Sequence, residues 1–121
     1  MASIPVTLLS AVTASGAGAS KSIGDFNIDS DRKGVPNGWT VEVKSTAAST
    51  AIVIDLEGSI DGGTTFFQLA RHTFTAGELT AKQAMFHVIN KGELAVRANL
   101  ITFTRSGTET LTAKAIASSN G

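Results

Sequence analysis

Short runs of alternating apolar and polar residues, separated by glycine-containing turns, constrain the fold of this chain more than any other feature. In the run 39–45, the side chains of Trp39, Val41 and Val43 fall on one face of an extended strand, and polar side chains fall on the other. The run 51–60 repeats this alternation. Because such runs recur every ~8–14 residues, we expect about eight strands. The pattern predicts an all-β protein.

The spacing of the runs favours an antiparallel β-sandwich, in which two sheets pack face to face. A jelly-roll-like sandwich is the first expectation, and an immunoglobulin-like sandwich is the second. The length of 121 residues suits a single domain that spans residues 1–121. We also expect the strands 39–45 and 51–60 to pair with each other, and the parity change at Leu100-Ile101 to mark a β-bulge or a bend.

Three shorter segments carry local expectations. Residues 15–20 predict a small flexible connection, residues 22–28 predict a short edge strand, and residues 78–84 are too few for a stable isolated helix. The apolar parity of the longer runs also predicts which side chains form the core. These are Trp39, Val41, Val43, Ile52, Ile54, Leu56, Leu94, Val96 and Leu111.

Charge and composition exclude several functional classes. Lys and Arg total 10 and Asp and Glu total 10, so no basic excess points to nucleic acid. The chain has no cysteine, which excludes disulfides and thiolate chemistry. The first residues lack the basic region of a signal peptide, and no stretch approaches the ~20 apolar residues of a membrane helix. We therefore expect no nucleic-acid or membrane partner.

Oxygen-bearing side chains recur at every second position in the segment 25–31. Calcium takes six to eight oxygen ligands, so such a ladder could wrap a cation. However, Ser30 stands where an EF-hand loop has glycine, and Pro36 stands where it has its bidentate glutamate. We therefore expect an edge strand with a polar face, and neither a metal ion nor a cofactor, at Asp25, Asn27, Asp29 and Asp31.

A second acidic pair lies on one strand. Asp55 and Glu57 are two residues apart, about 6–7 Å by strand rise, which is within the range of paired catalytic carboxylates. The more ordinary interpretation is a solvated sheet face. The histidines His72 and His87 are expected to be surface or interface side chains. We therefore predict no catalytic residue and no enzymatic activity.

Two stretches resemble a known group of proteins. The segment 57–69, with its Ser59-Ile60-Asp61-Gly62 turn, resembles a hairpin of small structural proteins encoded in the head–tail modules of tailed bacteriophages and prophages. Val96-Arg97-Ala98-Asn99, followed by Gly107-Thr108-Glu109-Thr110-Leu111, resembles their C-terminal hairpin, and the segment 6–18 fits the same style. These stretches cover roughly 30% of the chain.

The resemblance implies a virion structural protein without enzymatic residues. Size and expected fold are similar to capsid decoration, or cement, proteins. Such a protein would be made in the bacterial host cytoplasm, assemble as a homotrimer on the outer capsid surface and brace subunits of the major capsid protein. A neck, tail or head-fibre component is the alternative. A carbohydrate-binding or adhesion module is the alternative from another class, but it needs exposed aromatic rings, and Trp39 falls on the core parity.

The N-terminal segment 1–15 is the leading candidate for a contact with neighbouring subunits. Its apolar side chains fall on both parities of a strand, which suits an arm added to a neighbour; an ordinary first strand of the domain's own sheet is the alternative. The loop 29–38 and two isolated arginines are further candidates. The expected interface residues are Val6, Leu8, Leu9, Val12, Asp31, Arg32, Lys33, Arg97 and Arg105.

Overall fold

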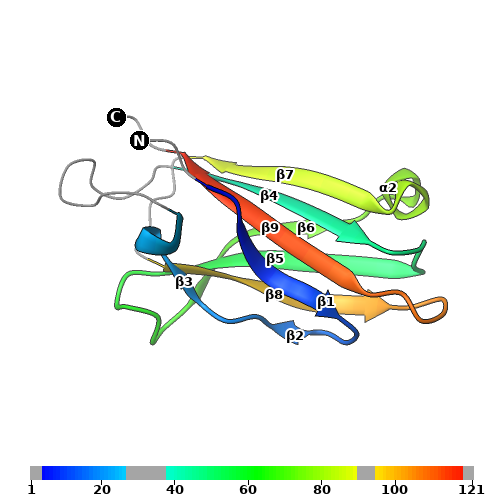
Figure 1. Cartoon of the computed structure of the whole chain (residues 1–121), viewed down its shortest axis with the longest axis horizontal. Helices are drawn as coiled ribbons and strands as arrows, with labels where there is room; N and C mark the ends of the chain where they lie inside the picture. Colours follow the sequence, from blue (N-terminus) through cyan, green and yellow to red (C-terminus); the bar gives the residue numbers. More distant parts are fainter. Residues whose placement is uncertain (1–3, 27–37, 90–94, 119–121) are drawn as a thin grey trace.

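Two antiparallel sheets pack face to face around an apolar core (Figure 1). The structure is a computed structural model that describes residues 4–26, 38–89 and 95–118. The four-stranded sheet has the order β1 (Val6–Val12), β9 (Leu111–Ser118), β4 (Gly38–Ser45) and β7 (Gln83–Ile89). The five-stranded sheet has the order β2 (Gly16–Ala17), β8 (Ala95–Thr104), β5 (Ala51–Ser59) and β6 (Phe67–Thr73), and β3 (Lys21–Ser22) also pairs with β8.

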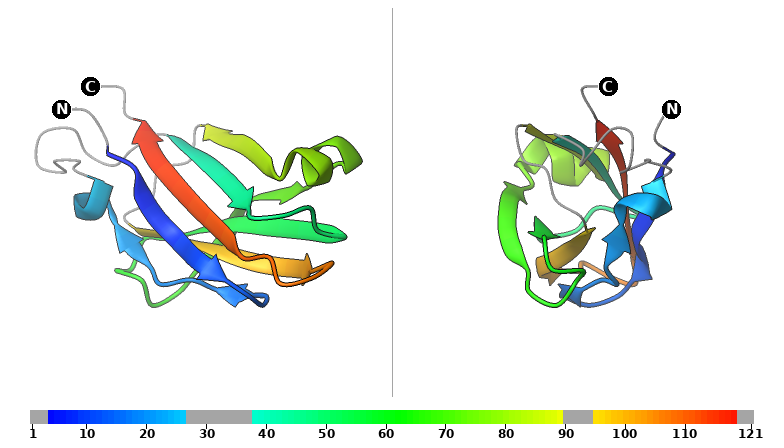
Figure 2. Two further views of the ribbon diagram at one scale, coloured as in Figure 1. Left: turned by 45° about the vertical axis from the view of Figure 1, so that its right-hand side comes forward. Right: turned by 90° about the vertical axis from the view of Figure 1, so that its left-hand side faces the viewer.

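The strand order is that of a jelly roll. Neighbours within the sheets include β1 with β9, β2 and β3 with β8, β4 with β7, and β5 with β6, as if the chain were first folded into one long hairpin. Rolling that hairpin then brings β9 against β4 and β8 against β5. The two views in Figure 2 show the rolled arrangement obliquely and from one end. The first expectation, a jelly-roll-like β-sandwich, is confirmed.

The expected pairing of strands 39–45 and 51–60 is wrong, because β4 and β5 belong to opposite sheets. The connection between them crosses from one sheet to the other instead of closing a hairpin. Its backbone is held by β8 and by the segment before β9: Thr46 N–H donates to the Thr110 carbonyl (3.0 Å), and Thr50 N–H donates to the Thr104 carbonyl (2.9 Å). A polar turn of this length can therefore close a hairpin or cross between two sheets.

The predicted strand parity is confirmed. Trp39 is 1% exposed, and its ring meets that of Phe26 edge to face, with centroids 5.1 Å apart. The inner face of β9 carries alanines, which let the two sheets approach each other closely. Of the expected core residues, Leu94 lies outside the described residues, and the others are buried: Trp39, Val41, Val43, Ile52, Ile54, Leu56, Val96 and Leu111.

The predicted bulge at Leu100-Ile101 is confirmed as well. Val53 of β5 lies opposite Thr102, whereas Ile54 lies opposite Leu100, so Ile101 is the extra residue. A bulged strand places two residues against one on its partner, which changes the face that later side chains occupy. This bulge explains why the apolar residues change parity at Leu100-Ile101 in the sequence.

A second bulge explains the apolar residues on both parities of the N-terminal segment. In β1, Thr7 lies opposite Lys114 and Leu9 lies opposite Ala113, so Leu8 is the extra residue. Both Leu8 and Leu9 therefore enter the core, at 3% and 4% exposure. Of the two alternatives for this segment, the structure places Val6–Val12 in the domain's own sheet.

The segment 22–28 does not form the expected edge strand. After the short β3, residues Ile23–Phe26 form a 3₁₀ turn, η1, while 27 and 28 lie outside the described residues. The start of the 3₁₀ turn is fixed by Asp25, whose Oδ2 accepts a hydrogen bond from Ser22 N–H at 2.9 Å. The connection 15–20 is also more ordered than expected, because Gly16 and Ala17 pair with Leu100 and Asn99 as β2.

The structure also contains a short helix where none was expected. Helix α2 (Ala76–Ala81) begins with a capping box: Thr75 Oγ1 accepts from Glu78 N–H at 3.2 Å, and Glu78 Oε1 accepts from Thr75 N–H at 2.9 Å. Lys82 closes the helix in the left-handed conformation. The Thr-x-x-Glu spacing was the available sequence signal. No helix in the described parts of the chain has the length and apolar character to span a membrane.

Candidate interaction surfaces

The outer face of the five-stranded sheet carries an ion-pair network that includes Asp55 and Glu57. Asp55 is 3% exposed and accepts two hydrogen bonds from Arg71, at 2.8 and 3.0 Å. Glu57 accepts from Arg97 Nε at 2.7 Å and from Asn99 Nδ2 at 3.0 Å. Burial raises the pKa of Glu57, but the hydrogen bonds from Asn99 and Arg97 outweigh it and lower the pKa. A general acid needs the opposite shift.

The two arginines predicted at an interface are engaged within the chain. Arg97 pairs with Glu57, and its guanidinium lies over the Phe66 ring, 4.1 Å from the ring centre. Arg105 Nη1 donates to the backbone carbonyl of Glu109 at 3.4 Å. The other charged candidates Asp31, Arg32 and Lys33 lie outside the described residues. Within the described ranges, no group of three His, Asp or Glu side chains could hold a metal ion.

The Ser-x-Asp-Gly segment that carries the family resemblance forms the connection between β5 and β6. Asp61 Oδ1 accepts from the Ser59 hydroxyl (2.6 Å) and from the N–H groups of Thr64 and Thr65 (3.1 and 2.9 Å). The hydrogen bond from Ser59 is the main cause of a lowered pKa of Asp61. The φ angles of Gly62 and Gly63, +80° and +96°, favour glycine. These residues therefore have a structural role in the turn.

Glu109 joins two connections at one end of the sandwich. It is 3% exposed, and its carboxylate accepts from the Ser49 hydroxyl (2.6 Å) and from the N–H groups of Ser106 (2.8 Å) and Gly107 (2.9 Å). The hydrogen bond from Ser49 is the largest cause that lowers the pKa of Glu109 to about 2. Because these donors bind a carboxylate more strongly than a neutral carboxyl group, ionised Glu109 stabilises the two loops.

We expect Glu109 to contribute to acid sensitivity. A folded-state pKa below the unfolded value of 4.5 gives stability that is present above about pH 4.5 and is lost as the pH falls toward about 2. Glu109→Gln should lower the melting temperature at neutral pH and reduce its fall with acidification. Thermal melts across that range measure both effects. Glu42→Gln, on the outer face of β4, is the control and should keep the wild-type pattern; an unchanged profile for Glu109→Gln would contradict the prediction.

The two histidines differ in their surroundings. The side chain of His72 is partly buried. Its ring stacks on that of Phe86, with the centroids 5.3 Å apart, and its Nε2 lies 3.0 Å from Glu78 Oε1. His87 lies on the exposed face of β7, with Nδ1 3.0 Å from Thr40 Oγ1. His87 is therefore the exposed side chain of the two, and His72 is partly covered by Phe86.

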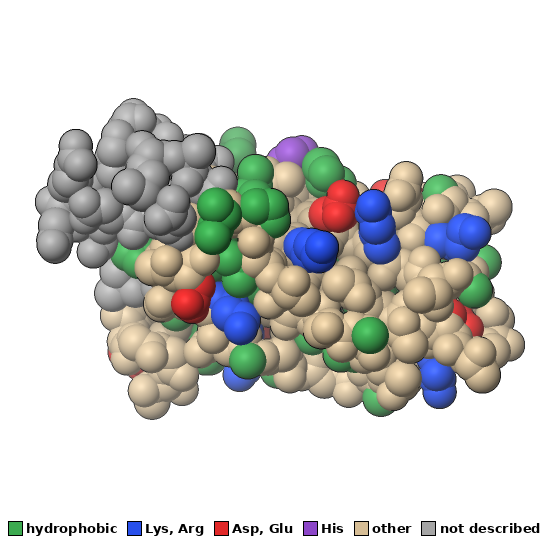
Figure 3. Space-filling model, viewed as in Figure 1, with side chains coloured by type: hydrophobic (Ala, Val, Ile, Leu, Met, Phe, Trp, Pro, Cys, Tyr) green, Lys and Arg blue, Asp and Glu red, His purple; other side chains and the backbone are tan. Residues whose placement is uncertain are grey.

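The outer face of the four-stranded sheet is one candidate contact surface. Its apolar side chains include Met85 and Ile89 of β7, at 54% and 71% exposure, and Ile116 of β9, at 40%. Beside them lies a shallow hollow of about 300 Å³. Figure 3 shows hydrophobic side chains next to clustered positive and negative ones on this face. The residues that line the hollow are Pro5, Thr40, Glu42, Met85, Lys114, Ala115 and Ile116.

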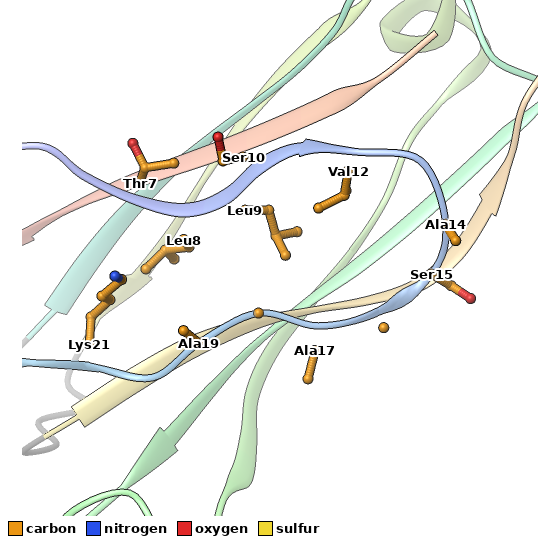
Figure 4. Close-up of a pocket in the computed structure, with 12 residues that line it drawn as sticks. Thr7, Leu8, Leu9, Ser10, Val12, Ala14, Ser15, Ala17, Ala19 and Lys21 are labelled. Atoms are coloured by element: carbon orange, nitrogen blue, oxygen red, sulfur yellow. The ribbon is translucent and has the colours of Figure 1, made fainter. Parts of the chain in front are cut away.

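A second hollow, of about 420 Å³, lies between the edge strands β1 and β2. Figure 4 shows Leu8 and Leu9 pointing from β1 into this space, whereas Thr7 and Ser10 point to the other side of the strand. The opposite wall is the segment 14–21, which is built of small residues and ends in Lys21. Val6 and Val12, the other two apolar interface candidates of β1, are half-buried. The groove therefore lies at the edge of the sandwich, beside the buried Leu8 and Leu9.

Comparisons with known proteins agree with the fold. No protein-family model matches the sequence, and no curated protein matches it. Among solved structures, the crystal structure of the SPBc2 prophage-derived protein YomS is similar, with a TM-score of 0.57 and 15% sequence identity. The similarity covers 95% of this chain and 92% of that one. At this identity the likeness shows a shared fold.

Proposed function

We propose that the protein is a structural component of a tailed-bacteriophage virion, and specifically a capsid decoration protein. The observation that carries this proposal is the jelly-roll fold, shared with a prophage-derived protein over 95% of the chain. The turn built on Ser59 and Asp61 supports it, because the same residues carry the resemblance to phage structural proteins. The protein would sit on the outer capsid surface and bind the major capsid protein.

The outer face of the four-stranded sheet is the surface we propose for that contact. Its exposed Ile116 and Met85 supply apolar area, and Glu42 and Lys114 supply charges around it. This combination suits a protein interface, in which an apolar centre is surrounded by polar groups. A carbohydrate-binding role is less well supported: Trp39 is 1% exposed, and the exposed aromatic side chain among the described residues is Phe67, at 66%.

Electron microscopy of particles tests the location. Particles from the phage that carries the gene should show an outer head density that is missing from particles made without the gene. Purified full-length protein, added back, should restore that density and sediment with the particles. Absence of the protein from purified particles would overturn the virion assignment, and a density at the neck, tail or a head fibre would replace decoration by the alternative.

The contact face has its own test in the same sedimentation assay. The double variant Lys114→Glu/Ile116→Glu places negative charge on the outer face of β9, and binding to particles should weaken by roughly tenfold or more. Thr73→Glu, on β6 of the other sheet, is the matched control and should bind like the wild type. Equal binding by both variants would exclude this face as the capsid contact.

A further inference from the structure

Among the described residues, strand β7 has one free edge, and its backbone is regular. Within the described residues it pairs with β4 alone, through seven successive register pairs from Gly38–Ile89 to Lys44–Gln83 without a shift. The other three edges of the sandwich are irregular or short. β1 has two register shifts, β6 has one, and β2 and β3 have two residues each.

The free edge of β7 also lacks the devices that keep strand edges apart. Proteins protect such edges with charges, prolines or bulges. The sequence of β7, QAMFHVI, contains no proline and no Asp, Glu, Lys or Arg. Its outward row is exposed and includes Met85 and Ile89. Unpaired backbone N–H and C=O groups on such an edge are satisfied by another extended strand.

We propose that two copies of this chain pair through β7, antiparallel about a two-fold axis at Phe86. The two four-stranded sheets then form one continuous sheet of eight strands. A second copy suits the edge because the strand is self-complementary in this register. Met85 lies opposite His87 of the other copy, Ala84 lies opposite Val88, and outward residues face outward residues throughout. Without charges in β7, and with a formal net charge of zero, no like charges meet.

This two-fold contact differs from the homotrimer implied by the family resemblance, and light scattering separates the two. The purified full-length chain should show twice the chain mass, with a concentration-dependent return to the monomer. A mass of three chains would overturn the β7 pairing, and so would a monomer at all concentrations. The measurement needs no phage particle, so its result is independent of the proposed virion role.

Charge substitutions identify the edge. Met85→Lys/His87→Lys places lysines directly opposite each other across the axis, where side chains are ~5 Å apart, and should weaken self-association at least about tenfold. Both positions are exposed, so the monomer should keep its β-sheet dichroism spectrum. Ile116→Lys, two strands away on the same face, is the control and should leave the dimer intact.

A rescue experiment separates pairing from general charge effects. Met85→Glu/His87→Glu should also be monomeric, whereas an equal mixture of the lysine and glutamate variants should form a heterodimer, because opposite charges then face each other. A heterodimer would support the two-fold pairing at β7. A mixture that stays monomeric, or a lysine variant that dimerises like the wild type, would overturn it.

Discussion

Replacing Ile54 by alanine is expected to reduce the free energy of unfolding by about 2–5 kcal/mol. Ile54 is 0% exposed. It lies on β5, between β6 and β8, opposite His72 of β6 and Leu100 of β8. Hydrogen-bonded ladders on both sides of β5 hold its backbone, so neighbouring side chains cannot collapse fully into the space left by the truncation. Chemical denaturation monitored by Trp39 fluorescence measures the loss.

Val53→Ala is the matched control. Val53 is the preceding residue on the same strand, but it faces the outer side of the sheet and is only half-buried. The substitution removes two methyl groups from a partly solvated site, so its cost should be well below that of Ile54→Ala. Equal losses for the two variants would contradict the assignment of the inner and outer faces of β5.

Strand parity and the β8 bulge were predictable because each depends on neighbouring residues alone. Side chains alternate with a period of two, so Trp39, Val41 and Val43 identify the inner face of β4 without any knowledge of its partners. The change of apolar parity at Leu100-Ile101 likewise reports the bulge directly. The spacing of the runs was also sufficient for the sandwich class.

Strand pairing was not predictable from local pattern. The connection between β4 and β5 is short and polar, which is equally compatible with a hairpin and with a crossing between sheets. Two contacts between residues distant in sequence accompany the crossing. Thr46 N–H donates to the Thr110 carbonyl, and Thr50 N–H donates to the Thr104 carbonyl. The β1 bulge was missed for a similar reason: an extra Leu8 and a strand buried on both sides leave the same apolar pattern.

The candidate surfaces were only partly predictable. Arg97 was predicted to be an interface residue, and within the chain it pairs with Glu57. The exposed apolar row of β7 was overlooked, although Met85 and Ile89 share a parity with the polar Gln83 and His87 in the sequence. The sequence signal for this exposed surface was the presence of two apolar residues, Met85 and Ile89, on the face of β7 that also carries Gln83 and His87.

Gly18→Ala is expected to destabilise the protein by roughly 1–3 kcal/mol, the range for overpacking a filled site. Gly18 N–H donates to the Ala98 carbonyl of β8 at 2.8 Å, which fixes the segment beside β1. A Cβ atom at this position would overlap the Leu8 carbonyl oxygen and would lie 2.8 Å from Leu9 Cδ2. Because the first contact is with backbone, β1 itself has to move, and its two core leucines move with it.

Gly24→Ala is the control, because the nearest atom to its added Cβ is Ser22 Oγ at 3.6 Å, an ordinary van der Waals contact. Its melting temperature should equal or slightly exceed that of the wild type, since alanine restricts the unfolded chain more than glycine does. Thermal melts of both variants measure the difference. If Gly18→Ala melts like Gly24→Ala, β1 leaves its place beside residue 18 without cost. That result would favour the alternative for the N-terminal segment, an arm added to a neighbouring subunit.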